Sequence, residues 1–552
     1  MNSSVKVRLI LASLLCVIAL GLVPPPARAA DLDLTSATIA DLDAALNSGA
    51  LTSEKLVQLY LARIAAYDKQ GPIINAVITL NPRALDEARA LDAERKAKGP
   101  RSPIHGIPMV LKDNYNTFDL QTAGGSQVLK GSIPPADAFV VNKLRQAGVI
   151  ILAKVNMSEF ASGGGAPNGF SSLGGQTRNP HDLTKGPAGS SGGTGASIAS
   201  AFAQFGMGTD TGGSIRGPSS VNGIVGLKPT RGLLSRNGII PLSLSLDTGG
   251  PMARSVSDIA VALGIMTGVD PADEATRTSA GRFYTDYTQF LKRGSLRGAR
   301  IGVARDYFGQ SADTDQIMEE AILKLKELGA TVVDPMKFPT FFMDSRRGMS
   351  SFNTEFKAQI AVYLATLKPG YPRTLAEIIA KAEDPATGYS SPWKLASLKR
   401  TLEVAQDFDD PTYQAIINEG YAMVRATVLA VMAKNNLDAF IYPTSARPAS
   451  PIGTGTMGGR GGGAGGGAGA EGEAGAAGPG GGVASVANQT GFPDLIVPAG
   501  MTKDGLPVTI SFCGPAYSEA KLIGYGYDFE QATKARVLPK YTPKLPGDLI
   551  NN

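Results

Sequence analysis

The 552-residue chain has few of the side chains that proteins commonly use as bases, thiol nucleophiles or metal ligands: 2 histidines and 2 cysteines. Only His105 and His181 can supply an imidazole. Two histidines, so few thiols and the lack of an H-E-x-x-H pattern argue against a zinc site, and we expect no bound metal. Any nucleophile in this chain therefore needs one of these two histidines, or a different residue type, as its base.

The first 30 residues predict a secretory signal peptide. Lys6 and Arg8 precede an apolar run over 9–23, and Ala27-Arg28-Ala29 matches a small-residue cleavage pattern. We expect cleavage near 29/30 and an exported mature chain, periplasmic or secreted. The run is short for a bilayer, which disfavours the alternative of an uncleaved anchor. We expect no later segment to be long and apolar enough to span a membrane, and so no stable membrane insertion after cleavage.

The charge balance gives no reason to expect a nucleic-acid partner. The formal net charge is +5, and residues 1–30 hold three positive charges and no negative one, which would leave +2 after cleavage. A nearly neutral chain lacks the basic surface that phosphate backbones require. Loss of Cys16 with the leader would leave Cys513 alone. We therefore expect no intrachain disulfide, and we predict that Cys513 is a buried strand residue.

Short apolar runs alternate with amphipathic helical patterns, which predicts an α/β fold. We expect one α/β/α domain over 31–552, with a large central mixed β-sheet flanked by helices. Strands are predicted near 76–81, 107–113, 148–156, 201–210, 300–306, 439–444, 494–500 and 507–514. Helices are predicted near 51–67 with Thr52 as N-cap, and near 83–99, 136–147, 194–205 and 315–329.

Two segments differ from this alternation. Residues 345–435 are mostly helical in pattern and predict a helical insertion over the sheet. Residues 453–482 are mostly glycine, and such a stretch buries too little apolar area to offset its ordering entropy. We expect a flexible surface loop there, and neither a nucleotide-binding loop nor a domain boundary.

Two segments dense in glycine and serine are the candidates for chemistry: KGPAGSSGGTGAS (185–197) and GTDTGGSIRGPSS (208–220). Neither has the Lys that follows the glycines in a phosphate-binding loop. A nucleophile-elbow pattern occurs at 189–193, but that arrangement needs a histidine later in the chain, and the last histidine is His181. Two glycine-rich turns without chemistry are the structural alternative.

Histidine as a base for Ser214 remains possible by chain order. The orders found in chymotrypsin-like and subtilisin-like enzymes allow a histidine before the serine. However, His105 lies in the turn-like SPIHGIP and His181 follows Asn179-Pro180. Both contexts indicate loop positions with structural roles.

Two lysine patterns offer another base. Ser391 and Lys394 form an S-x-x-K pair, but its companion motifs are missing and Pro392 fits poorly within the helix that this motif needs. Lys112 ends the apolar run 107–111, and a strand that carried it inward would lower its pKa by desolvation. From this segment alone, a solvated Lys112 paired with Asp113 is the simpler interpretation.

Five stretches match a family pattern: HGIPMVLKDN (105–114), AKVNMSEFA (153–161), QTRNP (176–180), GSSGGTGASIA (189–199) and GTDTGGSIRGPSSVNGIVGLKPTRG (208–232). Together they resemble the amidase signature family of serine hydrolases. The last two are the most specific, and they preserve a 24-residue spacing between Ser190 and Ser214. The resemblance covers about 35–540, with 345–435 and the glycine tract outside its recognisable core.

The resemblance implies a Ser–Ser–Lys triad. Ser214 would be the acyl nucleophile, Ser190 a relay serine preceded by a cis peptide bond, and Lys112 the terminal base. The backbone N–H groups of four residues would form the oxyanion hole: Thr211, Gly212, Gly213 and Ser214. Further residues would support the loops or line the acyl pocket. The supporting residues are Ser191, Asp210 and Arg216, and the pocket residues are Ser162, Gly163, Gly164 and Gly165.

The implied reaction is hydrolysis of a carboxamide to a carboxylate and ammonia or an amine, through an acyl-enzyme and without a cofactor. We expect a peptide C-terminal amide or a small carboxamide as substrate, and a monomer or homodimer. One alternative is the A-type subunit of an amidotransferase acting on charged transfer RNA, which the leader opposes. Another is a non-catalytic binding protein on the same scaffold, which the intact Lys112, Ser190 and Ser214 oppose.

Overall fold

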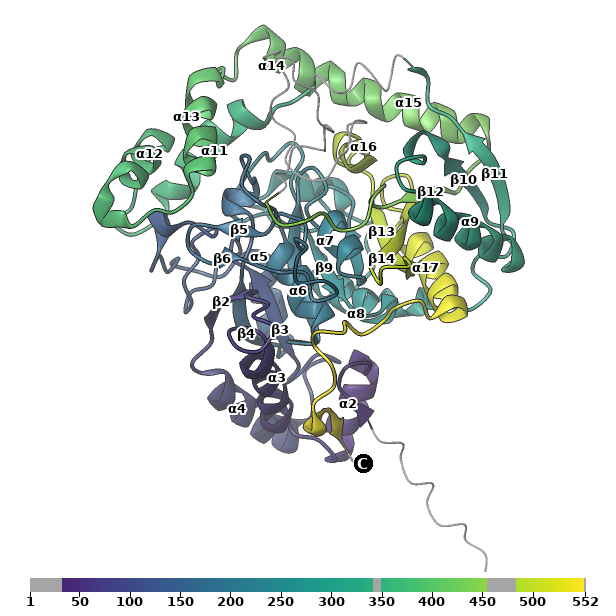
Figure 1. The fold of residues 1–552 in the computed structure, drawn as a ribbon, viewed down its shortest axis with the longest axis horizontal. Helices are drawn as coiled ribbons and strands as arrows, with labels where there is room; N and C mark the ends of the chain where they lie inside the picture. Colours follow the sequence, from purple (N-terminus) through teal and green to yellow (C-terminus); the bar gives the residue numbers. More distant parts are fainter. Residues whose placement is uncertain (1–31, 341–348, 454–482, 551–552) are drawn as a thin grey trace, which may run out of the picture.

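A computed structural model of the protein describes residues 32–340, 349–453 and 483–550. A single sheet of 11 strands runs through it, and helices cover both faces (Figure 1). The predicted α/β fold with a large central sheet is therefore confirmed. In spatial order the strands are β11 (Thr331–Met336), β10 (Arg300–Ala304), β12 (Ala439–Pro443), β14 (Pro507–Cys513), β13 (Asp494–Met501), β8 (Val225–Lys228), β9 (Thr248–Ala253), β7 (Phe205–Asp210), β3 (Pro108–Lys112), β4 (Ile150–Val155) and β2 (Val77–Leu80).

The sheet is mixed, as the sequence predicts. Strand β3 pairs in parallel with β4 and β7, and β10 pairs in parallel with β11 and β12. The other neighbours pair antiparallel. All residues of β3, β4 and β7 are buried, which places the carboxyl ends of these strands inside the protein.

The helices that flank the sheet form two layers, and the start of one of them, α3, was predicted from its capping residue. Helix α3 begins after Thr52, whose side chain accepts the N–H of Lys55, so the predicted cap is confirmed. The helices of the two layers are α2 (Ile39–Ser48), α3 (Ser53–Tyr67), α4 (Ala84–Lys98), α5 (Phe139–Gln146), α6 (Gly192–Ala199), α7 (Arg216–Val221), α8 (Val256–Met266), α9 (Ala312–Glu327), α16 (Val483–Thr490) and α17 (Glu519–Thr533).

Helices α6 and α7 pack on one face of the sheet, and α8 and α17 pack on the other. The glycines of α6 allow a very close approach. A methyl group at Gly193 would lie 2.2 Å from the carbonyl oxygen of Asn156, next to the end of β4. One at Gly208 of β7 would lie 2.8 Å from Ser191 Oγ. Close packing therefore requires many of the glycines in the two Gly/Ser segments.

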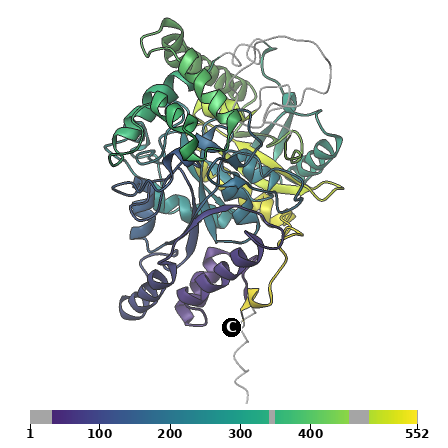
Figure 2. The same cartoon turned by 60° about the vertical axis from the view of Figure 1, so that its left-hand side comes forward.

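The two ends of the described chain lie together at the bottom of the molecule (Figures 1 and 2). There β1 (Leu32–Asp33) pairs antiparallel with β15 (Leu549–Ile550). Arg63 of α3 is fully buried beside them, forms an ion pair with Asp548, and donates to the carbonyl oxygens of Ser200 at 2.8 Å and Thr542 at 2.9 Å. This guanidinium ties the C-terminal segment to α3 and to the end of α6.

A third group of helices arches over one end of the sheet (Figures 1 and 2). It comprises α11 (Phe352–Ala365), α12 (Leu375–Glu383), α13 (Pro392–Val404), α14 (Pro411–Ala415) and α15 (Tyr421–Lys434). We call this group the helical layer. It falls within the segment for which the sequence predicts a helical insertion. The predicted signal peptide and cleavage site, and nearly all of the glycine tract, lie outside the described residues.

The expectation that no segment after the leader is long and apolar enough to span a membrane is wrong. Within the described residues, the helix Pro411–Lys434 is long and apolar enough to cross a bilayer by length and composition. The sequence analysis missed it because α14 and α15 are joined by a π-helical turn over Ile416–Gly420 into one continuous helix. Its buried residues Val424, Val428 and Met432 belong to a core cluster shared with β12 and α16, so its inward side is occupied by the protein itself.

Several element predictions fail in and after the two Gly/Ser segments. The helix expected over 194–205 ends at Ala199, and Ala201 has a positive φ of 52° before β7 begins. Strands β8 and β9 were not predicted, although they lie in the middle of the sheet. Strand β9 reads TGGPMA, which has one β-branched residue, Thr248, and none of the aromatic residues that help to mark a strand in sequence. Cys513 lies buried in β14, as predicted.

We predict that Gly193→Ala destabilises the protein strongly. The added methyl would overlap backbone atoms that cannot rotate away, and overpacking of this kind costs about 3 kcal/mol. Equilibrium urea unfolding followed by circular dichroism measures the change. The matched control is Gly547→Ala, whose methyl would meet nothing nearer than Leu59 Cδ2 at 3.5 Å. Equal midpoints for the two variants would show that the α6 packing is not as tight as described.

Candidate active site

Lys112 is the last residue of β3, and its side chain is fully buried. Its Nζ donates to Ser190 Oγ at 2.8 Å and to Thr209 Oγ1 at 2.7 Å, and the Thr209 carbonyl oxygen lies 3.4 Å away. Hydroxyl and carbonyl oxygens, and not a carboxylate, are thus its immediate partners. Asn114 donates to the same Thr209 hydroxyl at 3.0 Å.

Burial lowers the pKa of Lys112 from its usual 10.5 to about 7, although the charges of Asp210 and Asp247 oppose the shift. The neighbouring Asp113 has other partners, because its Oδ2 accepts the backbone N–H groups of Gly125 at 3.0 Å and Ala123 at 3.2 Å. The simpler sequence interpretation, a solvated Lys112 paired with Asp113, does not describe this site. An amine that loses its proton near neutral pH can act as a base.

The two Gly/Ser segments meet beside Lys112. The peptide bond between Gly189 and Ser190 is cis, the configuration that the family resemblance implies. Ser191 donates its N–H to the Ser214 carbonyl oxygen at 3.2 Å. Its Oγ accepts the Thr209 N–H at 3.2 Å, and the Thr209 carbonyl oxygen lies at the same distance. Ser191 therefore links the start of α6, strand β7 and the loop that carries Ser214. Ser190 and Ser214 are each 3% exposed.

Asp210 holds the loop 211–215 in shape. Its Oδ1 accepts the N–H of Gly213 at 2.8 Å, and its Oδ2 accepts the N–H of Ile215 at 2.9 Å. Burial disfavours its charge, but Arg216 and the backbone donors hold its pKa well below the ordinary range. The predicted supporting residues Asp210 and Arg216 are thus in direct contact, with Nη2 of Arg216 at 3.1 Å from Oδ1.

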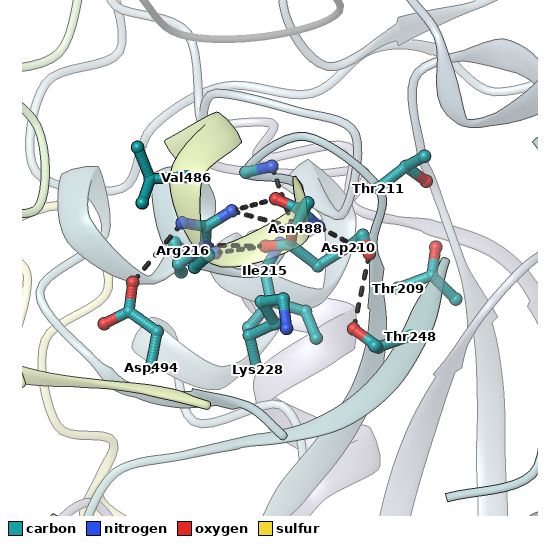
Figure 3. Close-up of polar contacts among 12 residues, drawn as sticks. Thr209, Asp210, Thr211, Ile215, Arg216, Lys228, Thr248, Val486, Asn488 and Asp494 are labelled. Atoms are coloured by element: carbon teal, nitrogen blue, oxygen red, sulfur yellow. Dashed lines mark hydrogen bonds and ion pairs between the residues drawn. The ribbon is translucent and has the colours of Figure 1, made fainter. Parts of the chain in front are cut away.

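A wider network surrounds this ion pair (Figure 3). Arg216 also lies 3.3 Å from Asp494 Oδ2 of β13 and donates to Asn488 of α16. Asn488 in turn donates Nδ2 to Asp210 Oδ1 at 3.0 Å. The loop is therefore fixed by residues that lie about 280 positions further along the chain. Sequence analysis missed Asn488 and Asp494, because neither lies within a motif.

One of the four backbone N–H groups expected to form the oxyanion hole is already engaged in a hydrogen bond. The N–H of Gly213 is engaged by Asp210. In the described part of the chain, no acceptor lies within hydrogen-bonding distance of the N–H of Thr211, Gly212 or Ser214. Gly213 has a φ of 127°, a conformation that glycine adopts readily and other residues do not. Thr211, Gly212 and Ser214 are therefore the donors available to a developing oxyanion.

A small cavity opens beside Thr209 and Thr211. It is lined mainly by a segment before β9, which we call the 239–248 loop: Ile239, Ile240, Pro241, Leu242, Leu244, Asp247 and Thr248, together with Asn114, Ala161 and Arg236. The Thr211 hydroxyl donates to Asp247. Burial raises the pKa of Asp247 to about 6, against this bond and two backbone donors. The walls are thus mostly apolar, with a carboxyl group beside the loop that carries Ser214.

The predicted pocket residues 162–165 are not among the residues that line this cavity. The carbonyl oxygen of Ser162 accepts Lys394 Nζ at 3.0 Å, and a methyl group at Gly164 would lie 2.6 Å from Ser397 Cβ. These residues, with Gly163 and Gly165, form a turn that packs on α13, whereas Ala161, just before them, lines the cavity. The structure places the predicted pocket residues next to the cavity and not around it.

The alternative bases are engaged in other contacts. His105 Nε2 lies 2.9 Å from the Leu91 carbonyl oxygen, and His181 Nε2 lies 3.2 Å from that of Asn222. Burial lowers the pKa of His181 to about 4. In the S-x-x-K pattern, Pro392 is accommodated as the first residue of α13, a favourable position for proline. Ser391 precedes that helix, and Lys394 bonds to Ser162.

No group of three or more His, Cys, Asp or Glu side chains in the described residues is arranged to hold a metal ion.

The functional residues that sequence reasoning missed are of two kinds. Thr209 lies inside the same motif as Ser214, so a local signal for it exists. Asp247 precedes a strand that was not predicted, and only the fold brings it to Thr211.

Comparison with known proteins identifies the family. The amidase family model matches residues 55–523, and the chain belongs to this family. A probable amidase of Arabidopsis thaliana is 34% identical over 520 residues, covering 92% of each chain. The A-type subunit of the glutamyl-tRNA(Gln) amidotransferase of Thermoanaerobacter pseudethanolicus is 32% identical, covering 92% of this chain and 99% of the relative.

Solved structures give the same assignment. The peptide amidase from Stenotrophomonas maltophilia has a TM-score of 0.82 at 38% identity, covering 92% of this chain and 99% of the other. An amidase family protein from Bacillus anthracis has a TM-score of 0.79 at 30% identity, covering 92% and 93%. The protein is an amidase-signature enzyme that hydrolyses amide C–N bonds.

Proposed function

We propose that this enzyme hydrolyses the C-terminal carboxamide of peptides, or a small carboxamide, through a Ser–Ser–Lys triad, and that it does so outside the cytoplasm. The observation that carries the proposal is the 2.8 Å bond from the buried Lys112 amine to Ser190 Oγ, next to the loop that holds Ser214. The similarity to a peptide amidase over nearly the whole chain supports the substrate class.

In the proposed mechanism, neutral Lys112 accepts the proton of Ser190 while Ser190 accepts that of Ser214. Ser214 Oγ attacks the amide carbonyl carbon, and the free N–H groups among Thr211, Gly212 and Ser214 stabilise the oxyanion. The proton returns through Ser190 to the leaving nitrogen as the C–N bond breaks. Water then hydrolyses the acyl-enzyme by the same relay in reverse. A lysine with a pKa near neutrality suits both directions of transfer.

A hydrolase that acts alone and an amidotransferase component differ in what they require. The identity to an A-type subunit over nearly its full length keeps the second function as the alternative. Ammonia release from peptide amides by the purified chain alone would support the hydrolase. Activity that depends on partner chains and charged transfer RNA would support the alternative, and no labelling by a serine-reactive fluorophosphonate would support a binding protein.

We predict that Ser214→Ala abolishes ammonia release across a panel of peptide amides, aryl amides and fatty amides, and that Lys112→Ala reduces it at least about 1000-fold. These changes remove the nucleophile and its base. His105→Ala and His181→Ala should retain most activity per folded molecule, since both imidazoles bond to distant carbonyl groups. Loss of turnover in a folded histidine variant would disprove the lysine-base mechanism.

We predict that kcat/KM rises with pH with an apparent pKa of about 7, the value for Lys112. Below this pH the amine is protonated and cannot accept the serine proton, so the rate falls about tenfold per pH unit. Above about pH 8 the rate should level off, because the amine is then neutral. Initial rates of ammonia release from acidic to mildly alkaline pH measure the profile. A plateau that extends unchanged two pH units below the Lys112 pKa would contradict Lys112 as the base.

For export, we predict that the chain purified from its native host begins near residue 30, because the leader pattern ends at Ala29. Mass spectrometry of the intact protein from periplasmic and culture fractions measures this. Recovery of the full-length chain, beginning at Met1, from the cytoplasm alone would reject the proposal.

A further inference from the structure

The wall of the cavity is held in place by the helical layer. We infer that Glu355 of α11 is a positioning residue that shapes an apolar subsite for the side chain next to the scissile amide. This inference rests on the proposed function, because it takes the cavity beside Thr209 and Thr211 as the acyl site. Glu355 does not itself line the cavity, and it lies in the segment outside the recognisable family core.

Four hydrogen-bond donors surround the buried carboxyl group of Glu355. Only 1% of the residue is exposed. Its Oε2 accepts Ser243 Oγ at 2.8 Å, the N–H of Ser245 at 3.0 Å and Gln359 Nε2 at 3.2 Å. Its Oε1 accepts the Tyr413 hydroxyl at 3.2 Å. A buried carboxyl group needs such donors, and each of them would lose a partner without it.

The donors fix consecutive residues of the 239–248 loop. Besides Ser243 and Ser245, the Leu244 N–H donates to Gln359 Oε1 at 2.9 Å. Ser351 Oγ lies 3.0 Å from the hydroxyl oxygens of both Ser243 and Ser245. Three successive loop residues are therefore bonded to the first two turns of α11 and the residue before it.

The 239–248 loop also contacts the segment that carries Ser214, through Asp247 and Thr211. Asp247 Oδ2 accepts the N–H groups of Leu242 at 2.9 Å and Ser243 at 3.0 Å, and the Thr211 hydroxyl donates to Oδ1. Leu242 and Leu244 line the cavity on either side of Ser243. The position of these two side chains is thus set by Asp247 on the catalytic side and by Glu355 on the helical side.

The chemistry of the wall indicates which substrates this arrangement favours. Ile239, Ile240, Leu242 and Leu244 are apolar. Arg236 lines the same cavity, but its guanidinium pairs with Asp273. An apolar side chain on the amide-bearing residue would bury its surface there, whereas a glycinamide would gain nothing. The preferred acyl group is therefore one with an aliphatic or aromatic side chain.

The test compares two dipeptide amides, one ending in leucinamide and one ending in glycinamide. The wild-type enzyme should show at least about a tenfold higher kcat/KM for the leucinamide. Glu355→Ala should raise KM for the leucinamide about tenfold with kcat within about threefold, and should change the glycinamide constants less than about twofold. Glu355→Gln keeps one acceptor oxygen and should recover part of the preference. The matched control is Glu403→Ala, an exposed glutamate of α13, which should behave as wild type.

Circular dichroism checks that each variant folds. The rate of fluorophosphonate labelling measures the reactivity of Ser214, and Glu355→Ala should leave this rate unchanged. Should Glu355→Ala fail to fold, Gln359→Ala removes the Leu244 bond and should shift the same ratio in the same direction. A proportional loss on both amides, or an unchanged ratio in folded variants, overturns the inference while leaving the proposed function intact. A wild-type enzyme that releases ammonia from neither amide overturns both.

Discussion

The site depends on one amine buried where no carboxylate neutralises it directly. The shift of the Lys112 pKa from 10.5 to about 7 corresponds to about 5 kcal/mol in favour of the neutral form. Strand β3 imposes this, because it runs between β4 and β7 and all of its residues are buried. The hydroxyl groups of Ser190 and Thr209 complete the surroundings. A hydroxyl partner leaves the amine available to take a proton, which an adjacent carboxylate would oppose by favouring the ammonium.

A second constraint holds the loop 211–215, which carries Ser214, in shape. Asp210 and Arg216 are buried and charged, and their charges are tolerated because each is bonded several times. Their partners come from α16 and β13, far along the chain. Loop, helix and strand therefore form one hydrogen-bonded unit. Preorganised backbone donors at Thr211, Gly212 and Ser214 follow from this, because the loop does not need to rearrange when charge develops.

Much of the fold and part of the site could be predicted from the sequence. Strands rich in aliphatic residues, such as β3 and β14, were found because their apolar runs are distinctive. Strand β9 was missed because its glycines serve close packing: a methyl group at Gly250 would lie 2.1 Å from the Leu227 carbonyl oxygen. The pocket prediction at Ser162 to Gly165 rested on family position alone. The contacts of these residues with α13 depend on a region that the family pattern does not describe.

The sequence by itself determined the family, and the resemblance carried by its local motifs singled out Lys112, Ser190 and Ser214 as the candidate triad. It also ruled out a nucleophile elbow, through the early position of its last histidine. Only the tertiary structure decided how deeply Lys112 is buried and thus its pKa. It also decided that Gly213 donates to Asp210, and that Glu355 and Asp247 hold opposite sides of the cavity loop. Burial and long-range hydrogen bonds arise from residues that are distant along the chain, and no local pattern encodes them.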